Sequence, residues 1–244
     1  MYLNLDSLQM RYEPFPIGLA QPILDRQTYD EMVASFPPRD LFLHMSKLGD
    51  KFTLSEKFNS KNYHAYVRSH PAWREFHRYV KSDAFIPGVL GALRNRHVDL
   101  GIEPAPAGIL GRLISLFSRR PVPLSTRFEF SMLPAAGGNI RPHTDNANKI
   151  VTLVISMVRP GEWDTKLGGG TEVLRPKGVR HAYNQINESA DFSEFDTIYT
   201  YEFLPNQAVV FVKTFNSWHA VRPMTGSDPA RMRRTLTINI EAPK

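Results

Sequence analysis

The sequence contains no cysteine among its 244 residues. Disulfide bonds, thiolate metal sites and a cysteine nucleophile are therefore excluded. A metal site in this protein has to be built from histidine and carboxylate side chains, which suit iron, manganese, zinc or copper. The search for chemistry is thus restricted to His, Asp and Glu residues in patterns that can surround one ion.

Long apolar runs and clusters of basic residues are also missing. No stretch reaches the length of a membrane span, and the first residues lack the basic start and apolar run of a signal peptide, so we expect a cytoplasmic protein. The formal net charge is +6, without a long Lys/Arg run that would mark a nucleic-acid arm. This excess favours a basic solvated surface and tilts the expected substrate towards an anion.

The first half of the chain is predicted to form helices and loops. Apolar residues on one face predict a helix over residues 24–36. A second helix is predicted from Pro71, because proline is favoured in a first helical turn. A third is predicted after Asp83, a candidate N-cap. The proline- and glycine-rich stretch 101–123 predicts a loop that carries the best candidate boundary.

The second half is predicted to form short strands separated by turns. Eight candidate strands follow one another, at residues 127–133, 139–145, 149–157, 169–175, 197–205, 208–215, 218–223 and 233–240. Such a series is typical of a sandwich, barrel or jelly roll. We therefore expect a helical and loop region over 1–126 that packs on a β core over 127–244, as one integrated domain, with the polar stretch 176–195 as a candidate flap.

A candidate metal site lies where His143 and Asp145 are separated by one residue. Residues two apart on a strand point to the same face, so both side chains can reach one ion. His219, on a later candidate strand, can supply a third ligand. Two histidines and one carboxylate leave coordination positions open, an arrangement typical of non-haem Fe(II) oxygenases. Taken singly, each of these residues is also consistent with an ordinary surface or half-buried side chain.

A polar stripe on the last candidate strand adds a second element to this site. Arg233, Thr235 and Thr237 share one face of the strand, and apolar residues alternate onto the other. An arginine offers a fork of donors that binds a carboxylate in a bidentate way, and a neighbouring threonine hydroxyl can add a hydrogen bond. Arg231 and Arg234 lie so near that each is an alternative anchor.

The order of these motifs resembles the Fe(II)/2-oxoglutarate-dependent oxygenases, in the branch that includes prolyl hydroxylase-like enzymes. The resemblance covers residues 127–241 and rests on R-P-H-T-D, V-T-L-V-I-S, G-G-G-T-E, L-P-N-Q-A-V-V-F, W-H-A-V-R-P-M and R-R-T-L-T. It implies a mainly β protein whose core is a double-stranded β-helix (jelly roll, cupin-like), with helices added at the amino-terminal side.

The resemblance also implies the roles of individual residues. The family's metal motif falls on His143, Asp145 and His219 as Fe(II) ligands. Its Arg-x-Ser/Thr motif falls on Arg233 and Thr235 as the anchor of the distal carboxylate of 2-oxoglutarate. O₂ is then consumed in hydroxylating a small molecule, an amino acid or a peptide side chain. Related halogenases replace the carboxylate ligand by a small residue, so Asp145 favours hydroxylation or a desaturating or ring-forming variant.

Several further residues are candidates for contacts around the site. Asn139 and Arg141 share the face of the first metal ligand if the strand alternates regularly. Trp218 adjoins another ligand, and His181 lies in the polar insertion. Many relatives place a tyrosine near the distal carboxylate, and in this chain Ser156 stands where it is expected.

Two other functions compete with this hypothesis. Oxidative demethylases of alkylated nucleic acid belong to the same family, but they usually carry a second functional arginine six residues beyond the first, where this chain has Asn239. A jelly-roll binding module without oxygenase activity is the second alternative. Arg233 and Thr235 argue against it, because such a module needs no carboxylate anchor opposite a metal. The sequence leaves the primary substrate and the oligomeric state open.

Overall fold

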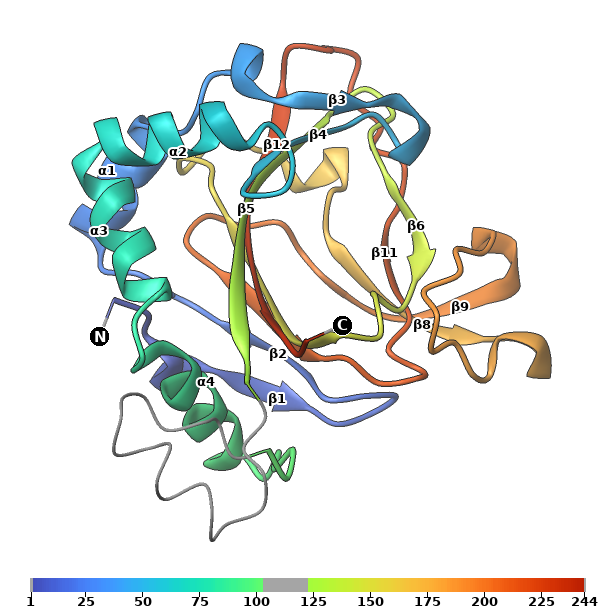
Figure 1. Cartoon of the computed structure of the whole chain (residues 1–244). Coiled ribbons are helices and arrows are strands. Elements are labelled where there is room, and N and C mark those ends of the chain that lie inside the picture. The colour runs from blue at the N-terminus through green and yellow to red at the C-terminus, as the bar shows by residue number, and fades with distance from the viewer. Residues whose placement is uncertain (1, 103–122, 244) are drawn as a thin grey trace, which may run out of the picture.

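The computed structural model describes residues 2–102 and 123–243, which form two antiparallel sheets that face each other, with helices packed on the outside of the larger one (Figure 1). The larger sheet has, in spatial order, β1 (Gln9–Arg11), β2 (Ile17–Ala20), β10 (Ala208–Val212), β7 (Lys149–Ser156), β12 (Met232–Glu241), β5 (Ser125–Pro134), β4 (Lys51–Ser55) and β3 (Leu43–Met45). The smaller sheet has β6 (Ile140–His143), β11 (His219–Val221), β8 (Thr171–Pro176) and β9 (Phe195–Tyr201).

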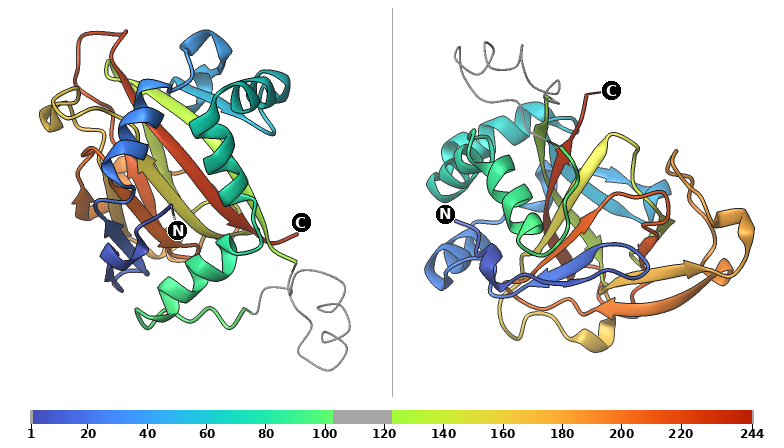
Figure 2. Two further views of the ribbon diagram at one scale, coloured as in Figure 1. Left: turned by 90° about the vertical axis from the view of Figure 1, so that its left-hand side faces the viewer. Right: turned by 90° about the horizontal axis from the view of Figure 1, so that it is seen from below.

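Four α-helices lie together on the outer face of the larger sheet (Figure 2). They are α1 (Arg26–Ala34), α2 (Ser60–Ser69), α3 (Pro71–Val80) and α4 (Phe85–Arg94). Trp73 of α3 packs edge-on against Phe130 of β5, with ring centroids 4.7 Å apart. Burial of such large aromatic side chains holds the helices on the sheet. Within the described residues, no helix has the length and apolar character needed to cross a bilayer.

Strand β12 shows how the larger sheet divides its two faces. Leu236, Ile238 and Ile240 are fully buried in the core beneath the helices. Arg233 and Thr235 alternate onto the opposite face, which looks towards the smaller sheet and lines a cavity. The strand is central, because β5 pairs along one side of it and β7 along the other. The alternation predicted from the sequence is therefore confirmed, and an edge strand with a solvated arginine is excluded.

The predicted β core is confirmed, and the first half contains more strand than predicted. All eight candidate strands of the second half form, in the jelly-roll double-stranded β-helix arrangement. The prediction of only helices and loops in the first half is wrong, because β1 to β4 extend both edges of the larger sheet. These strands are only three to five residues long, too short for a clear alternating pattern.

The helix predictions need one correction. The helices expected over 24–36 and from Pro71 form as α1 and α3. Asp83 does not cap the third helix, because α4 begins after Ala84 and its first turn receives no side-chain hydrogen bond. Most of the loop and the boundary expected within 101–123 lie outside the described residues.

Candidate metal centre

His143 and His219 meet where two strands of the smaller sheet pair. His143 is the last residue of β6 and His219 is the first of β11, and the antiparallel register places them opposite each other. Their ring centroids are 4.2 Å apart. One nitrogen of each ring and one oxygen of Asp145 all lie within 4.8 Å of one another. In residues 2–102 and 123–243 this is the one cluster of His, Asp or Glu able to hold a metal ion. The predicted triad is therefore brought together.

The route by which Asp145 reaches this cluster differs from the prediction. Strand β6 ends at His143, and Asp145 lies in the following turn with a left-handed φ of +70°, a conformation that aspartate tolerates better than most residues. The Thr144 hydroxyl anchors the turn by donating to the backbone carbonyl of Asn184 at 2.7 Å. Strand alternation is thus the wrong explanation for the shared position, because a turn directs the carboxylate back towards His143.

Hydrogen bonds to the backbone orient both imidazole rings. The Nδ1 atom of His143 lies 3.0 Å from the carbonyl oxygen of Arg141, and Nδ1 of His219 lies 2.9 Å from that of Ser217. A carbonyl oxygen only accepts, so each Nδ1 carries the proton and donates. In a neutral ring with its proton on Nδ1, the Nε2 atom has a lone pair, as a metal ligand requires. The Nε2 atom of His143 faces Oδ1 of Asp145 at 3.5 Å.

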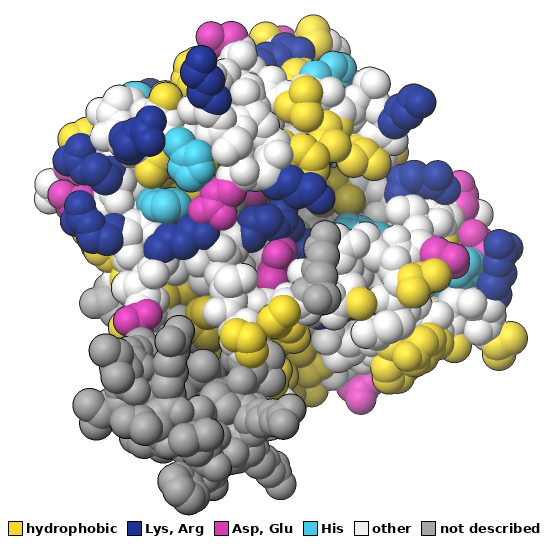
Figure 3. All heavy atoms as spheres, in the orientation of Figure 1, with side chains coloured by type: hydrophobic (Ala, Val, Ile, Leu, Met, Phe, Trp, Pro, Cys, Tyr) yellow, Lys and Arg dark blue, Asp and Glu magenta, His cyan; other side chains and the backbone are white. Residues whose placement is uncertain are grey.

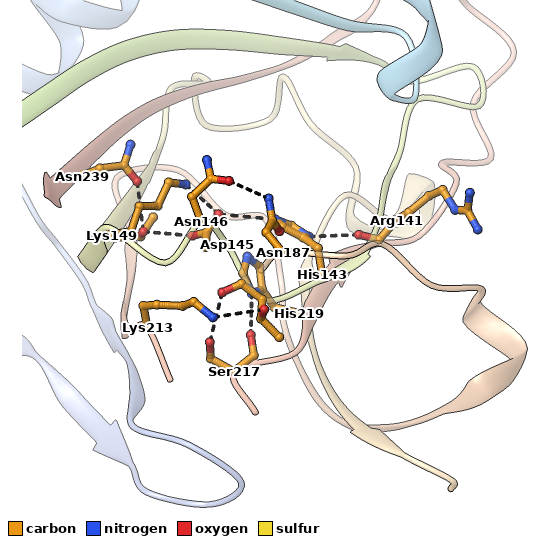
Figure 4. Close-up of polar contacts among 12 residues, drawn as sticks. Arg141, His143, Asp145, Asn146, Lys149, Asn187, Lys213, Ser217, His219 and Asn239 are labelled. Atoms are coloured by element: carbon orange, nitrogen blue, oxygen red, sulfur yellow. Dashed lines mark hydrogen bonds and ion pairs between the residues drawn. The ribbon is translucent and has the colours of Figure 1, made fainter. Parts of the chain in front are cut away.

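The Asp145 carboxylate is buried and held by two neighbours (Figure 4). The Lys149 ammonium donates to Oδ1 at 2.6 Å, and the Thr152 hydroxyl donates to Oδ2 at 3.1 Å. Burial raises the pKa of Asp145, but Lys149 and His143 outweigh it and hold the pKa well below its ordinary value. Burial also lowers the pKa of His219, to about 3, with a smaller contribution from His143. At neutral pH the site offers an ionised carboxylate and a neutral imidazole.

These observations fit a divalent ion. Two imidazole nitrogens and a carboxylate oxygen lie within 4.8 Å of one another, so one ion placed among them could bind all three. Neutral imidazole and carboxylate ligands on one face suit Fe(II), with further positions left open for other ligands.

Arg233 is a buried cation in the same cavity. It is 4% exposed, and burial lowers its pKa to about 9, so it remains charged at neutral pH. Its Nε donates to the carbonyl oxygen of Gly169 at 2.5 Å, and the guanidinium lies 4.5 Å from the ring centroid of Phe203. No described carboxylate pairs with it. A buried charge without a partner is costly, so the free end of the guanidinium fits an anionic ligand.

The neighbouring glycine makes room for this arginine. Gly169 has a φ of +86°, and a Cβ atom there would lie 3.2 Å from Cδ of Arg233 and 3.1 Å from Sδ of Met224. The glycines Gly168 to Gly170 lead into β8, and Gly168 and Gly169 both have a positive φ. The backbone carbonyl of Gly169 also holds Arg233 in place, because it accepts the hydrogen bond from Nε.

The two alternative arginines lie elsewhere. Arg231 is exposed, and Arg234 points to the opposite face of β12, where it donates to Glu162 at 2.5 Å. Both line a separate surface cleft rather than the cavity of the triad. Thr235 does face the cavity, and its hydroxyl lies 2.9 Å from that of Ser131. Of the three arginines, Arg233 is therefore the one that lines the cavity of the triad, with Thr235 beside it.

The remaining candidates have structural contacts. Trp218 is fully buried, packs against Phe195 and donates to the carbonyl oxygen of His181. His181 itself pairs with Glu194 at 2.6 Å. Asn139 donates to a carbonyl oxygen within its own turn. Of this group only Arg141 lines the cavity.

Sequence reasoning missed several residues that surround the triad. Lys149 and Thr152 hold the metal carboxylate, and the side-chain oxygen of Asn239 lies 3.0 Å from the same Thr152 hydroxyl. Asn239 lies two residues beyond Thr237 on β12, so the alternation of Arg233, Thr235 and Thr237 could have predicted that it faces the cavity. Lys149 and Thr152 carried no such signal, because the turn that brings Asp145 to them was not predicted.

Comparison with known proteins identifies the domain. Residues 128–241 match the family model of the 2OG-Fe(II) oxygenase superfamily. These residues form a 2OG-Fe(II) oxygenase domain. The metal triad and Arg233 all lie within this oxygenase domain. No curated protein matches the chain.

Solved structures with the same fold include a prolyl 4-hydroxylase, a 2-oxoglutarate-dependent epimerase and a protein with 2-oxoglutarate bound. HygX from Streptomyces hygroscopicus, with nickel and 2-oxoglutarate bound, has a TM-score of 0.53 at 9% identity, covering 92% of this chain and 82% of that one. The epimerase SnoN from nogalamycin biosynthesis has a TM-score of 0.52 at 13% identity, covering 92% and 78%. A prolyl 4-hydroxylase from Phytophthora capsici has a TM-score of 0.51 at 14% identity, covering 93% and 58%.

These similarities support the shared fold, and the family supplies the cofactors. The oxygenase uses Fe(II) and 2-oxoglutarate. The structure agrees with both, since it offers three converging ligand atoms for the metal and an unpaired buried guanidinium for a carboxylate.

Proposed function

We propose that the protein hydroxylates a small molecule, an amino acid or a peptide side chain, and that His143, Asp145 and His219 hold the iron while Arg233 and Thr235 hold 2-oxoglutarate. The observation that carries this proposal is that one cavity, of about 550 Å³, is lined by all five residues. A metal triad and a lone buried cation in one cavity can bind the two ends of one ketoacid.

Each part of the cavity has its own task. The triad occupies one side of the metal and leaves positions for the ketoacid and O₂. The guanidinium of Arg233 and the hydroxyl of Thr235 bind the distal carboxylate and fix the orientation of the ketoacid. When bound, Fe(II) and 2-oxoglutarate supply the oxidising chemistry, in which one oxygen atom of O₂ enters succinate and the other enters the substrate.

Hydroxylation is the outcome that the ligand set favours. Asp145 provides the third protein ligand, so the position that a small residue leaves for halide in related halogenases is filled. Asn239 lines the cavity at the place of the second arginine of the nucleic-acid demethylases. Its amide lacks the positive charge of that arginine, and this favours a substrate other than alkylated nucleic acid.

Anaerobic spectroscopy tests the proposal. Adding Fe(II) and then 2-oxoglutarate to the full chain is expected to produce a metal-to-ligand charge-transfer absorption, and admitting O₂ is expected to release succinate. His143→Ala should abolish both signals, whereas His64→Ala, an exposed histidine on α2, should leave them unchanged. Absence of the absorption in the unaltered protein, or its survival in His143→Ala, would contradict the proposal.

A further inference from the structure

The cavity continues beyond the space between the triad and Arg233. Its wall also includes residues of β4 and β5, of the turn after β6, and of the insertion between β8 and β9. Asn187 from that insertion donates to Oδ1 of Asn146 in the turn, at 3.2 Å (Figure 4). This contact joins the insertion to the turn in the cavity wall beside the triad. The continuation therefore offers space for a small substrate next to the metal ligands.

Positive charge dominates this part of the wall. Apart from the metal ligand and the ketoacid anchor, the charged residues that line the cavity are five cations and one carboxylate, namely Lys47, Lys51, Arg127, Arg141, Lys149 and Glu129. Figure 3 shows Lys and Arg side chains gathered beside the hollow on this face. A concave wall with charge of one sign concentrates ligands of the opposite sign.

The ion pairs in the wall leave their positive members facing the cavity. Glu129 accepts from Lys51 at 2.7 Å and from Arg127 at 2.8 Å. Its side chain is only 5% exposed, whereas those of Lys51 and Arg127 are 25% and 21% exposed. The Glu129 carboxylate is therefore covered, whereas Lys51 is more accessible. Arg127 is also paired with Glu241 at 2.8 Å, so the Lys51 ammonium is the more available of the two cations.

Lys149 brings a further positive charge close to the metal ligands. Its ammonium lies 2.6 Å from Oδ1 of Asp145, so a group bound to it also lies close to the iron. Because Asp145 shares its charge with the metal ion, Lys149 can still attract an anion.

Two buried polar groups of the cavity also lack hydrogen-bond partners among the described residues. The side-chain nitrogen of Asn239 and the hydroxyl of Thr53 belong to residues that are 0% exposed, and neither atom has a hydrogen-bond partner. Both residues line the cavity. Unpaired buried polar groups cost free energy, so they are expected where a polar ligand completes their hydrogen bonds.

We infer that the primary substrate is a small organic anion, and that its carboxylate or phosphate group is bound in this cavity by Lys51 and Lys149. The inference rests on the proposed function, since it places the reacting C–H group beside the iron. It narrows the substrate from any small molecule, amino acid or peptide to a compact acid.

Matched pairs of compounds test the charge requirement. The full chain, loaded anaerobically with Fe(II) and 2-oxoglutarate, is titrated with L-malate and L-aspartate against malamide and L-asparagine. In a second arm, phosphoserine and glucose 6-phosphate are compared with serine and glucose. Perturbation of the charge-transfer absorption reports binding, and succinate release after O₂ is admitted reports turnover. We expect at least one acid to bind tenfold or more tightly than its neutral counterpart, and the responding arm distinguishes carboxylate from phosphate.

A variant tests the site itself. Lys51→Gln combined with Glu129→Gln removes the ammonium without leaving a buried carboxylate unpaired. Loss of one charge-assisted hydrogen bond predicts roughly a tenfold weaker binding of the acid that responded. The affinities for Fe(II) and 2-oxoglutarate should not change. Lys61→Gln, which removes an exposed lysine on α2, is the matched control and should behave as the unaltered protein.

The outcomes separate this inference from the proposed function. If the charge-transfer absorption forms and neutral compounds bind as tightly as acids, the inference is overturned and the proposed function stands. The same holds if no acid in either arm binds at about 10 mM, or if the double variant binds the acid as tightly as Lys61→Gln does. If the absorption never forms, the proposed function fails, and the inference falls with it.

Discussion

The hydroxyl of Thr152 on β7 donates to Oδ2 of Asp145 at 3.1 Å, across the turn that returns the carboxylate to the two histidines. The other carboxylate oxygen is bound by Lys149. Asp145 has a left-handed backbone in the turn that follows β6, so strand alternation does not direct its side chain. Strand β7 therefore positions the Asp145 carboxylate. The sequence alone indicated this ligand only through its spacing from His143.

Replacement of Thr152 is expected to weaken metal binding without unfolding the protein. Thr152→Val keeps the shape of the side chain but removes the donor, and loss of such a supporting hydrogen bond typically costs about 10- to 100-fold in metal affinity. Anaerobic Fe(II) titration measures the effect, and thermal unfolding checks the fold. Thr152→Ser keeps the hydroxyl and should stay close to the unaltered protein. Equal Fe(II) affinity in Thr152→Val would show that the hydrogen bond is dispensable.

Replacement of Arg233 is expected to weaken 2-oxoglutarate binding, whereas replacement of Arg234 is not. Arg233→Lys keeps a charge but loses the bidentate fork, so the Kd for 2-oxoglutarate should rise about tenfold or more. Arg234→Lys, on the other face of β12, is the matched control and should leave this Kd unchanged. Titration of the charge-transfer absorption with 2-oxoglutarate measures both. A larger effect at Arg234 than at Arg233 would reassign the anchor.

A methyl group added at Gly169 should disturb the arginine rather than only the turn. In Gly169→Ala the new carbon would meet Arg233 and Met224, whereas in Gly168→Ala the nearest contact is an ordinary 3.9 Å. Both glycines have positive φ, so each substitution should cost about 1–3 kcal/mol of unfolding free energy through backbone strain. Only Gly169→Ala should also raise the Kd for 2-oxoglutarate. A comparable rise in Gly168→Ala would contradict the crowding argument.

The buried Glu129 carboxylate should make stability depend on pH on the acid side. Burial raises its pKa, but Lys51 and Arg127 outweigh this and lower it below its ordinary value of 4.5. A group whose pKa is lower in the folded state stabilises fully above the unfolded pKa, and this stabilisation is lost as the pH falls through the folded value.

Glu129→Gln should therefore be less stable by about 2 kcal/mol at neutral pH, and the difference should shrink as the pH falls from about 5 to about 3. Thermal unfolding of both proteins across this range measures it. Exposed Glu13→Gln is the control and should follow the unaltered protein throughout. A difference in Tm that stays constant with pH would show that the ion pairs do not carry the effect.

The sequence by itself determined the β core and most of the site. Alternation along β12 separated Leu236, Ile238 and Ile240 from Arg233 and Thr235, because a strand in a packed sheet must bury one face. The motif spacing picked out His143, Asp145 and His219. The alternation along β12 is visible in the sequence because it depends on residue type at a short, regular interval, whereas the triad followed from its resemblance to the metal motif of the family.

The tertiary structure decided which arginine faces the cavity, how Asp145 reaches the histidines and which cations line the cavity. The choice of Arg233 over Arg231 and Arg234 needed the sheet on both sides of β12, which shows which face is enclosed. The turn at Asp145 depends on contacts with distant segments, such as the hydrogen bond from Thr144 to Asn184. The cations that line the cavity include Lys51 of β4, Arg127 of β5 and Lys149 of β7, which are far apart in sequence and share one cavity only because of the tertiary fold.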